Sequence, residues 1–158
     1  MPQPTREQWE RLYREEFPRI YRALVMVLRD RERALDALHD AFTEGLRRPP
    51  RDDENLTGWL FRVALRGGRR GLRRAASSAT RAVAGSNTRD ELAEALDRAE
   101  VGRLMAMLTA RQRAMVIAEY YLDLDQEDIA RIFGVQRGTV AATLAQARAR
   151  MRTGGQDV

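Results

Sequence analysis

Residues 125–144 read DQEDIARIFGVQRGTVAATL, and this stretch decides the fold of the second half of the chain. Asp125 is a good helix N-cap, and the following residues 126–133 have the pattern of a short helix. Gly134 permits the tight turn that ends this helix. A second helix is predicted to begin near Arg137, so the stretch consists of two helices joined by a short turn.

The residues at the expected crossing of these two helices are small or β-branched. Ala130 is small where the helices would meet, and Ile129 and Val140 would pack the pair together. This spacing is typical of a helix-turn-helix, in which the second helix projects its first residues into the major groove of DNA. The alternative is an ordinary helical hairpin that contacts no DNA.

The rest of the chain also has helical periodicity. Apolar residues recur every three or four positions, and no segment alternates like a strand, so we predict an all-α fold. Thr5 with Gln8 and Thr109 with Gln112 are candidate capping boxes. Pro18 should kink the first helix or mark a junction between two helices. The residues predicted to face the cores are Leu35, Leu38, Phe42 and Leu46, then Trp59, Leu60, Val63 and Ala64, and finally Val140, Leu144, Ala147 and Met151.

A change of composition divides the chain into two small helical bundles. Residues 75–89 are rich in Ala, Ser and Gly and carry only scattered apolar residues, which is typical of a flexible linker. We therefore predict an N-terminal domain at 1–74 and a C-terminal domain at 90–158. The C-terminal domain would contain a helix from Thr109 to about Leu122 and then the helix-turn-helix.

Positive charge is concentrated in the middle of the chain. Residues 1–58 carry 11 Arg against 12 acidic residues, and residues 90–158 carry 9 Arg against 11. Residues 59–89 carry 8 Arg and no acid. The excess charge therefore lies in one segment, which indicates a local contact with a polyanion.

Several functional classes find no support in the sequence. The chain has no cysteine and a single histidine, so we expect no metal site and no disulfide, and the cytoplasm is the expected compartment. It has no apolar run long enough to cross a membrane and no apolar stretch typical of a secretory signal. Neither a catalytic triad, a carboxylate pair nor a phosphate-binding glycine loop is visible, so we expect no catalytic residue, no cofactor and no enzyme activity.

Motifs along nearly the whole chain resemble the extracytoplasmic-function sigma factors of bacterial RNA polymerase. The motifs that resemble region two are Leu12-Tyr13-Arg14-Glu15, Leu35-Asp36-Ala37-Leu38-His39-Asp40-Ala41-Phe42 and Trp59-Leu60-Phe61-Arg62-Val63-Ala64. Those that resemble region four are Leu108-Thr109-Ala110-Arg111-Gln112-Arg113, Glu127-Asp128-Ile129-Ala130, Gly134-Val135, Gly138-Thr139-Val140 and Ala147-Arg148-Ala149-Arg150. The order agrees with that of the family, and a linker lies where the family has one.

The resemblance implies a polymerase-binding helix in the first half. Residues 35–42 would dock on the coiled coil of the β′ subunit, with Asp36 and Asp40 facing basic residues. The set assigned to this contact is Asp36, His39, Asp40 and Phe42. The alternative for the two aspartates is an ordinary solvated helix face.

The resemblance also implies two DNA-binding elements. The first is the arginine-rich segment 59–74, where arginines at spacings of three and four would form one cationic stripe suited to phosphates. The second is the start of the last helix. The assigned residues are Trp59, Arg62, Arg66, Arg69, Arg70 and Arg73, and then Gln136, Arg137, Thr139, Thr143 and Arg148. A basic but merely solvated face is the alternative for the stripe.

The chain departs from the family pattern at positions that matter for DNA binding. Arg66 and Arg70 stand where the family commonly has Asn and Asp. The family's usual Lys, Ser and Arg are replaced in the last helix by Ala141, Ala142 and Thr143. Glycines in the arginine-rich segment, at 67, 68 and 71, weaken a helix by about 0.5–1 kcal/mol each. The replacements in the last helix predict a C-terminal domain that reads few bases.

The function predicted from these features is that of an alternative sigma factor. It would bind core RNA polymerase through the β′ and β subunits and direct initiation at promoter DNA, and an anti-sigma factor is a further possible partner. A first alternative is a sigma-like co-regulator that binds a partner protein and has lost independent promoter reading. A second is a plain helix-turn-helix regulator with no polymerase contact.

Overall fold

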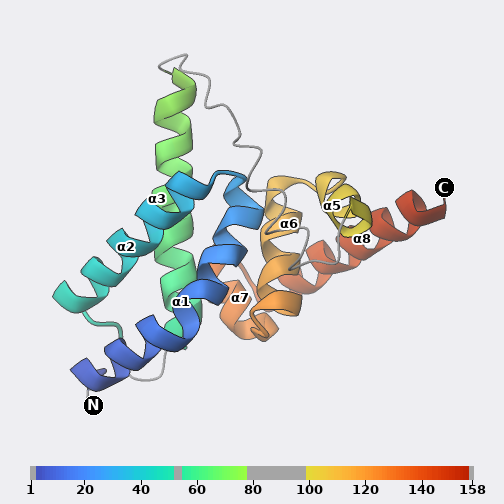
Figure 1. Cartoon of the computed structure of the whole chain (residues 1–158). Helices are drawn as coiled ribbons and strands as arrows, with labels where there is room; N and C mark the ends of the chain where they lie inside the picture. Colours follow the sequence, from blue (N-terminus) through green and yellow to red (C-terminus); the bar gives the residue numbers. More distant parts are fainter. Residues whose placement is uncertain (1–2, 52–54, 78–98, 157–158) are drawn as a thin grey trace. The chain divides into compact units, whose positions relative to one another are not determined.

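The computed structural model describes residues 3–51, 55–77 and 99–156, and for residues 71–77, 99–101 and 155–156 it describes the backbone alone. The regular secondary structure of this part is entirely helical, as predicted (Figure 1). The chain divides into two compact units, Met1–Ala84 and Gly85–Val158. Most of the linker predicted at 75–89 lies outside the described residues, but its first three residues are helical.

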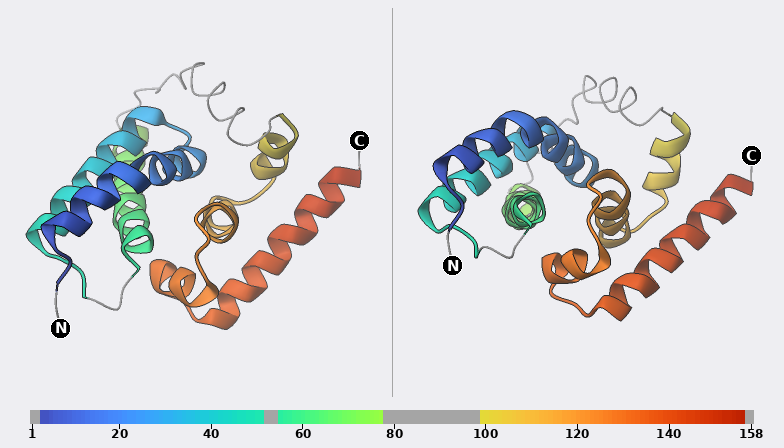
Figure 2. Two further views of the ribbon diagram at one scale, coloured as in Figure 1. Left: turned by 60° about the horizontal axis from the view of Figure 1, so that its bottom comes forward. Right: turned by 90° about the horizontal axis from the view of Figure 1, so that it is seen from below.

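The first helix, α1 (Arg6–Leu28), begins at the predicted capping box. The Thr5 hydroxyl accepts a hydrogen bond from the Gln8 amide at 3.2 Å, and the Gln8 side chain accepts one from the Thr5 amide at 2.7 Å. Pro18 lies inside a single continuous helix, so the alternative of a junction between two helices is wrong. Figures 1 and 2 show that α1 bends along its length, as expected where proline removes a backbone hydrogen bond.

The second helix, α2 (Arg31–Arg47), buries only part of the predicted face. Leu38 and Phe42 are buried, but Leu35 is 38% exposed and Leu46 is 62% exposed. The buried side is completed by small residues, which are Ala34, Ala37, Ala41 and Gly45. Small side chains let neighbouring helices approach closely, so the centre of the buried stripe lies on the alanines and two of the leucines are left outside.

The third helix, α3 (Leu56–Ser77), packs against both α1 and α2. Trp59, Leu60 and Ala64 are buried as predicted, whereas Val63 is only half-buried. The structure buries two residues that were not predicted, which are Phe61 and Leu65. Gly68 is also buried, and a side chain there would collide with the methyl groups of Leu28.

Aromatic rings join the three helices of the N-terminal unit. The Trp9 ring packs edge-to-face on Phe42 and on Trp59, with ring centroids 6.1 Å apart in both pairs. The same ring lies directly against the backbone of Gly45, where a Cβ atom would overlap it. Because Trp9, Phe42 and Trp59 come from three different helices, this cluster fixes their spacing.

The C-terminal unit is built around its last helix. The elements described in this unit are α5 (Ala99–Ala106), α6 (Ala110–Val116), the π-helical segment η1 (Ile117–Tyr121), α7 (Gln126–Phe133) and α8 (Arg137–Gln156). The capping box predicted at Thr109 and Gln112 is present, with both hydrogen bonds at 3.1 Å. The helix predicted to continue to Leu122 instead changes to π-helical geometry at Ile117.

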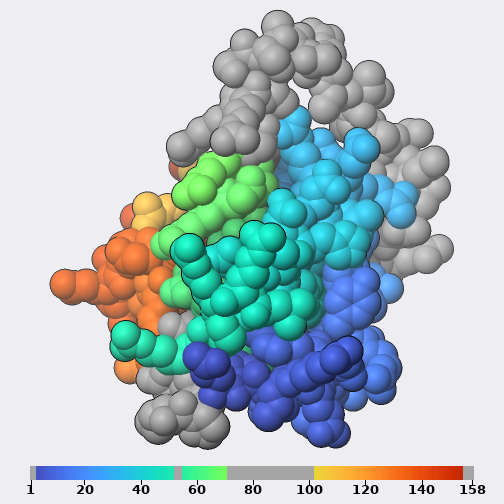
Figure 3. All heavy atoms as spheres, turned by 90° about the vertical axis from the view of Figure 1, so that its left-hand side faces the viewer, coloured from blue at the N-terminus to red at the C-terminus, as the bar shows by residue number. Residues whose placement is uncertain are grey.

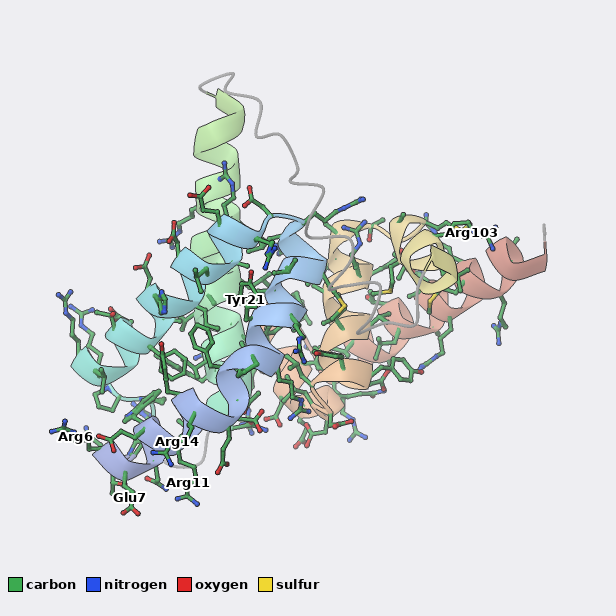
Figure 4. The ribbon with its side chains drawn as sticks, viewed as in Figure 1. Arg6, Glu7, Arg11, Arg14, Tyr21 and Arg103 are labelled. Carbon is green, nitrogen blue, oxygen red and sulfur yellow. The ribbon has the colours of Figure 1, made fainter. Side chains whose placement is uncertain are left out.

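Charged side chains project from the ends of both units. Figure 4 shows Arg6, Glu7, Arg11 and Arg14 pointing outward at the beginning of α1, and Arg103 pointing outward from α5. No helix in the described part of the chain is both long enough and apolar enough to cross a membrane.

A pair of glycine substitutions tests the packing of the N-terminal unit. Gly45→Ala should lower the free energy of unfolding by about 1–3 kcal/mol, because the new methyl group overlaps the Trp9 ring. Gly67→Ala is the control, since no atom lies near its Cβ position, and it should raise stability by about 0.5–1 kcal/mol. Urea unfolding measures both. Equal effects of the two substitutions would contradict the close contact at Gly45.

Candidate nucleic-acid interface

Local backbone chemistry fixes the turn between α7 and α8. The Asp125 carboxylate accepts a hydrogen bond from the Asp128 amide at 2.8 Å, which caps α7 as predicted. Gly134 ends the helix in the left-handed region, with φ of 63°. The Gly134 amide donates to the Arg131 carbonyl at 3.3 Å and the Val135 amide to the Ala130 carbonyl at 3.0 Å. These two bonds form a Schellman motif, which needs a glycine at its left-handed position.

The two helices pack together through the residues that the sequence predicted. Ile129 and Val140 have no exposed surface, and Ala130 is 9% exposed. Leu144 and Ala147 continue the buried stripe along α8 towards α6. The α7–α8 pair is therefore a helix-turn-helix in which the first residues of α8 are free to face a ligand.

The outward face of α8 carries few polar groups between its first turn and Gln146. Gln136, Arg137 and Thr139 are exposed where the helix begins, as a base-reading set requires. Ala142 and Ala145 are the next exposed residues, and the exposed face beyond them carries Gln146, Arg150, Arg152 and Thr153 together with Ala149. The Thr143 hydroxyl donates to the Thr139 carbonyl at 2.8 Å, so its proton is already used within the helix.

Arg148 is held by the π-helical segment. Its Nη1 atom donates to the Tyr120 hydroxyl at 2.9 Å and to the Glu119 carboxylate at 3.5 Å. The hydrogen bond with Tyr120 raises the pKa of Arg148 above its usual value, and the Glu119 charge adds a smaller effect. The sequence assigned Arg148 to DNA, but the structure shows it linking α8 to η1. Nothing in the local sequence predicts this contact, because its partners lie 28 and 29 residues away.

The start of α7 is acidic. Partial burial raises the pKa of Asp128, and the nearby charges of Asp125 and Glu127 raise it further. Arg131 lowers it again through an ion pair at 3.7 Å. This concentration of negative charge disfavours contact between phosphates and the first turn of α7. The first turn of α8, in contrast, carries no acidic residue.

The arginines of α3 differ in exposure. Arg66 and Arg70, one turn apart, are exposed and make no hydrogen bond or ion pair within the described residues. Arg62 and Arg69 are half-buried and have other interactions within the chain. The side chain of Arg73 lies outside the described residues. Among the described side chains of the predicted stripe, Arg66 and Arg70 are the exposed ones.

Trp59 does not present its ring to a ligand. The sequence assigned it to the DNA-binding set, but it is only 9% exposed and packs edge-to-face on Trp9. Its place in the structure is in the core that supports the start of α3.

The outer face of α2 carries the residues assigned to polymerase binding, with one exception. Asp36, His39 and Asp40 are exposed. Phe42 is only 7% exposed, and its ring stacks on Phe17 at 5.9 Å, so it supports the surface from beneath. The His39 ring lies 5.3 Å from the same Phe17 ring.

Apolar side chains that the sequence did not assign to a function lie beside these polar residues. Leu35 and Leu46 are exposed on α2, and Tyr13 on α1 is 49% exposed with its ring 5.3 Å from Phe42. Leu35, His39 and Leu46 follow one stripe of α2, because they are spaced by four and seven residues. We call Tyr13, Leu35, His39 and Leu46 the docking ridge. Figure 3 views the N-terminal unit from the side on which α2 lies in Figure 1.

Within the described residues, no group of three or more histidine or acidic side chains is arranged to hold a metal ion. The candidate site consists of three surfaces: the start of α8, the exposed arginines of α3 and the docking ridge.

Comparisons with known proteins agree on one family. Residues 98–151 match the family model for region 4 of sigma-70. The chain is 31% identical over 149 residues to the ECF RNA polymerase sigma factor SigM of Mycobacterium tuberculosis, in two strains, and the match covers 92% of this chain and 76% of the relative. The fold resembles that of the sigma factor RpoE from Bartonella quintana, solved with the anti-sigma factor NepR. The TM-score is 0.73 at 19% identity, over 93% of this chain and 96% of that chain.

Substitution of Asp125 tests how the helix-turn-helix is held. Asp125→Ala should lower the free energy of unfolding by about 1 kcal/mol, because the Asp128 amide loses its acceptor. Asp125→Asn keeps an acceptor oxygen and removes a like charge near Asp128, so it should cost much less. Urea unfolding of the two variants measures the difference. If Asn destabilises as much as Ala, the stabilising factor is the charge and not the cap.

Proposed function

The chain belongs to the extracytoplasmic-function sigma factors, and we propose that its two units divide the tasks of that family between polymerase docking and promoter contact. It is an alternative sigma factor, whose function is to bind core RNA polymerase and direct transcription initiation. The observation that carries the proposal is the α7–α8 helix-turn-helix inside the region-4 match, in a chain similar to a sigma factor along almost its whole length.

We place polymerase docking on α2. The docking ridge consists of two leucines, one tyrosine and one histidine, and Asp36 and Asp40 lie beside it on the exposed side of the helix. A suitable partner has an apolar stripe flanked by basic residues, which fits the coiled coil assigned to the β′ subunit. Burial of Leu35 and Leu46 at this contact would remove exposed apolar surface, and the aspartates would set the orientation through charge pairs.

Promoter contact would fall to two elements. The exposed Arg66 and Arg70 of α3 suit the phosphates of a duplex that is being opened. Gln136, Arg137 and Thr139 at the start of α8 suit base edges or phosphates in the major groove. The domain assignment that accompanies this proposal is region two at 1–74 and region four at 90–158, joined by a linker at 75–89.

The remaining parts of the proposal concern partners and place of action. The chain would act by binding and not by catalysis, in the cytoplasm with the polymerase, and the C-terminal unit would contact the β subunit. An anti-sigma factor accompanies the structural relative from Bartonella quintana, and a protein of that class would inhibit this chain by covering the docking ridge.

Run-off transcription with purified core polymerase tests the function directly. With this chain as the only sigma factor, core polymerase should give transcripts from fragments of its own genome that core polymerase alone does not give. Binding to core polymerase without any specific transcript would favour the co-regulator. Absence of both would leave a plain helix-turn-helix regulator.

Charge reversal on α2 tests the docking surface. Asp36→Arg with Asp40→Arg should weaken binding to core polymerase by roughly tenfold or more, because two favourable charge pairs become repulsive. The fold should persist, since both side chains are exposed. Affinity measured by fluorescence anisotropy with labelled chain gives the result.

The matched control is Glu15→Arg on α1, which is exposed but lies about 200° around the helix from Tyr13. It should leave the affinity for core polymerase nearly unchanged. If the double variant binds core polymerase as well as the natural chain does, docking through α2 is wrong.

A further inference from the structure

Four arginines lie on α8, and two of them are committed to contacts inside the C-terminal unit. Arg148 is bound to Tyr120 and Glu119 of η1. The Nη1 atom of Arg150 donates to the Gln112 side chain at 3.4 Å, and the same Gln112 oxygen accepts the Thr109 amide in the capping box of α6. These contacts join α8 to two preceding elements, one on each flank of its buried stripe.

The α3 arginines present the opposite case. Arg66 and Arg70 lie on one exposed face, and Gly67 between them leaves open space with no atom near its Cβ position. Neither arginine has a partner within the described residues. The segment 59–89 that contains them has no acidic residue, whereas residues 90–158 have two more acids than arginines. Both the local contacts and the wider charge therefore favour phosphate binding by α3 over phosphate binding by the flanks of α8.

We infer that the two DNA-facing elements of this chain contribute unequally. Arg66 and Arg70 of α3 contact phosphates and supply affinity, while Arg148 and Arg150 are positioning residues that hold α8 and contact no DNA. This inference rests on the proposed function, because it assumes that both elements face DNA. It differs from the assignment made on the sequence, in which Arg148 was a DNA ligand.

The physical reason is the free energy that an arginine loses when it exchanges an existing protein contact for a phosphate. A guanidinium that moves to a phosphate must release its existing acceptors, and for Arg148 these include a carboxylate that repels the phosphate. An exposed arginine such as Arg66 loses no protein contact when it binds DNA. Each phosphate neutralised releases counterions, which makes the contribution measurable as a salt slope.

The experiment compares three double variants of the full chain that change the net charge equally. They are Arg66→Ala with Arg70→Ala, Arg148→Ala with Arg150→Ala, and Arg11→Ala with Arg14→Ala, the last pair being exposed on α1 (Figure 4). The probe is a short, fluorescein-labelled duplex of mixed sequence, titrated by anisotropy at several salt concentrations. Thermal unfolding of each variant is the second readout.

We expect the α3 variant to lose about two units from the slope of log affinity against log salt concentration. Between about 50 and 200 mM salt, the affinity of the natural chain for the duplex should therefore fall roughly tenfold more than the affinity of this variant. The α8 and α1 variants should keep the natural slope. The α8 variant should also unfold at a lower temperature, whereas the α3 variant should not. Arg150→Ala alone breaks the longer bond and provides the test if the double variant does not fold.

Three results would overturn the inference: an equal loss of slope in the α8 variant, an unchanged slope in the α3 variant, or no salt-dependent binding by the full chain. If the α1 variant loses the same slope as the other two, net charge alone controls binding. The run-off assay judges the sigma function separately. If the chain directs transcription but the salt slopes differ from those expected, only this inference is overturned and the proposed function stands.

Discussion

The last helix of the chain must serve two purposes with one set of side chains. It is the helix on which the C-terminal unit is built, because α5, α6 and α7 all pack against it. It is also the helix whose first turn faces outward as part of a helix-turn-helix. Val140, Leu144 and Ala147 serve the core, and Arg148 and Arg150 link its flanks to neighbouring elements. What remains for a ligand is the first turn, the exposed alanines, and the side chains of Gln146 and Arg152.

In the N-terminal unit, glycine and alanine allow close packing of the core and leave larger apolar side chains on the surface. Gly45 and Gly68 allow the Trp9 ring and the Leu28 side chain to lie against the backbones of α2 and α3. The close packing that results uses the small face of α2, and it leaves Leu35 and Leu46 on the surface. A tightly packed core and an exposed apolar ridge are therefore consequences of the same arrangement. The ridge is available to a partner because the core does not need it.

Local chemistry accounts for what the sequence predicted correctly. The caps at Thr5, Thr109 and Asp125 and the turn at Gly134 each depend on residues within about five positions, so they can be recognised without knowledge of the fold. The buried face of α2 could not be predicted in the same way. Periodicity identifies an apolar stripe, but the neighbouring helices decide which edge of that stripe is covered.

The residues of the candidate site show the same limit of prediction from local sequence. Exposure of Asp36, His39 and Asp40 and of the start of α8 followed from helical geometry. Burial of Phe42 and Trp59 depended on the Trp9 ring, which comes from a third helix. Arg148 contacts Glu119 and Tyr120 of the π-helical segment, which the sequence did not predict. Side chains of arginine are long enough to bind a distant protein group or DNA, and sequence alone does not distinguish the two.

An unequal division of DNA contact is workable because both units belong to one chain. Once one unit is bound, the other meets its target at a high effective concentration, so it needs little affinity of its own. In the proposed arrangement the α8 helix would discriminate between sequences with a few groups at its first turn, since a good bidentate contact is worth about 1–3 kcal/mol. Strong phosphate binding by α8 would add affinity for every sequence equally and would not improve that discrimination. Arginines committed to the fold are therefore compatible with a helix whose task is selection, provided that α3 and the polymerase hold the complex together.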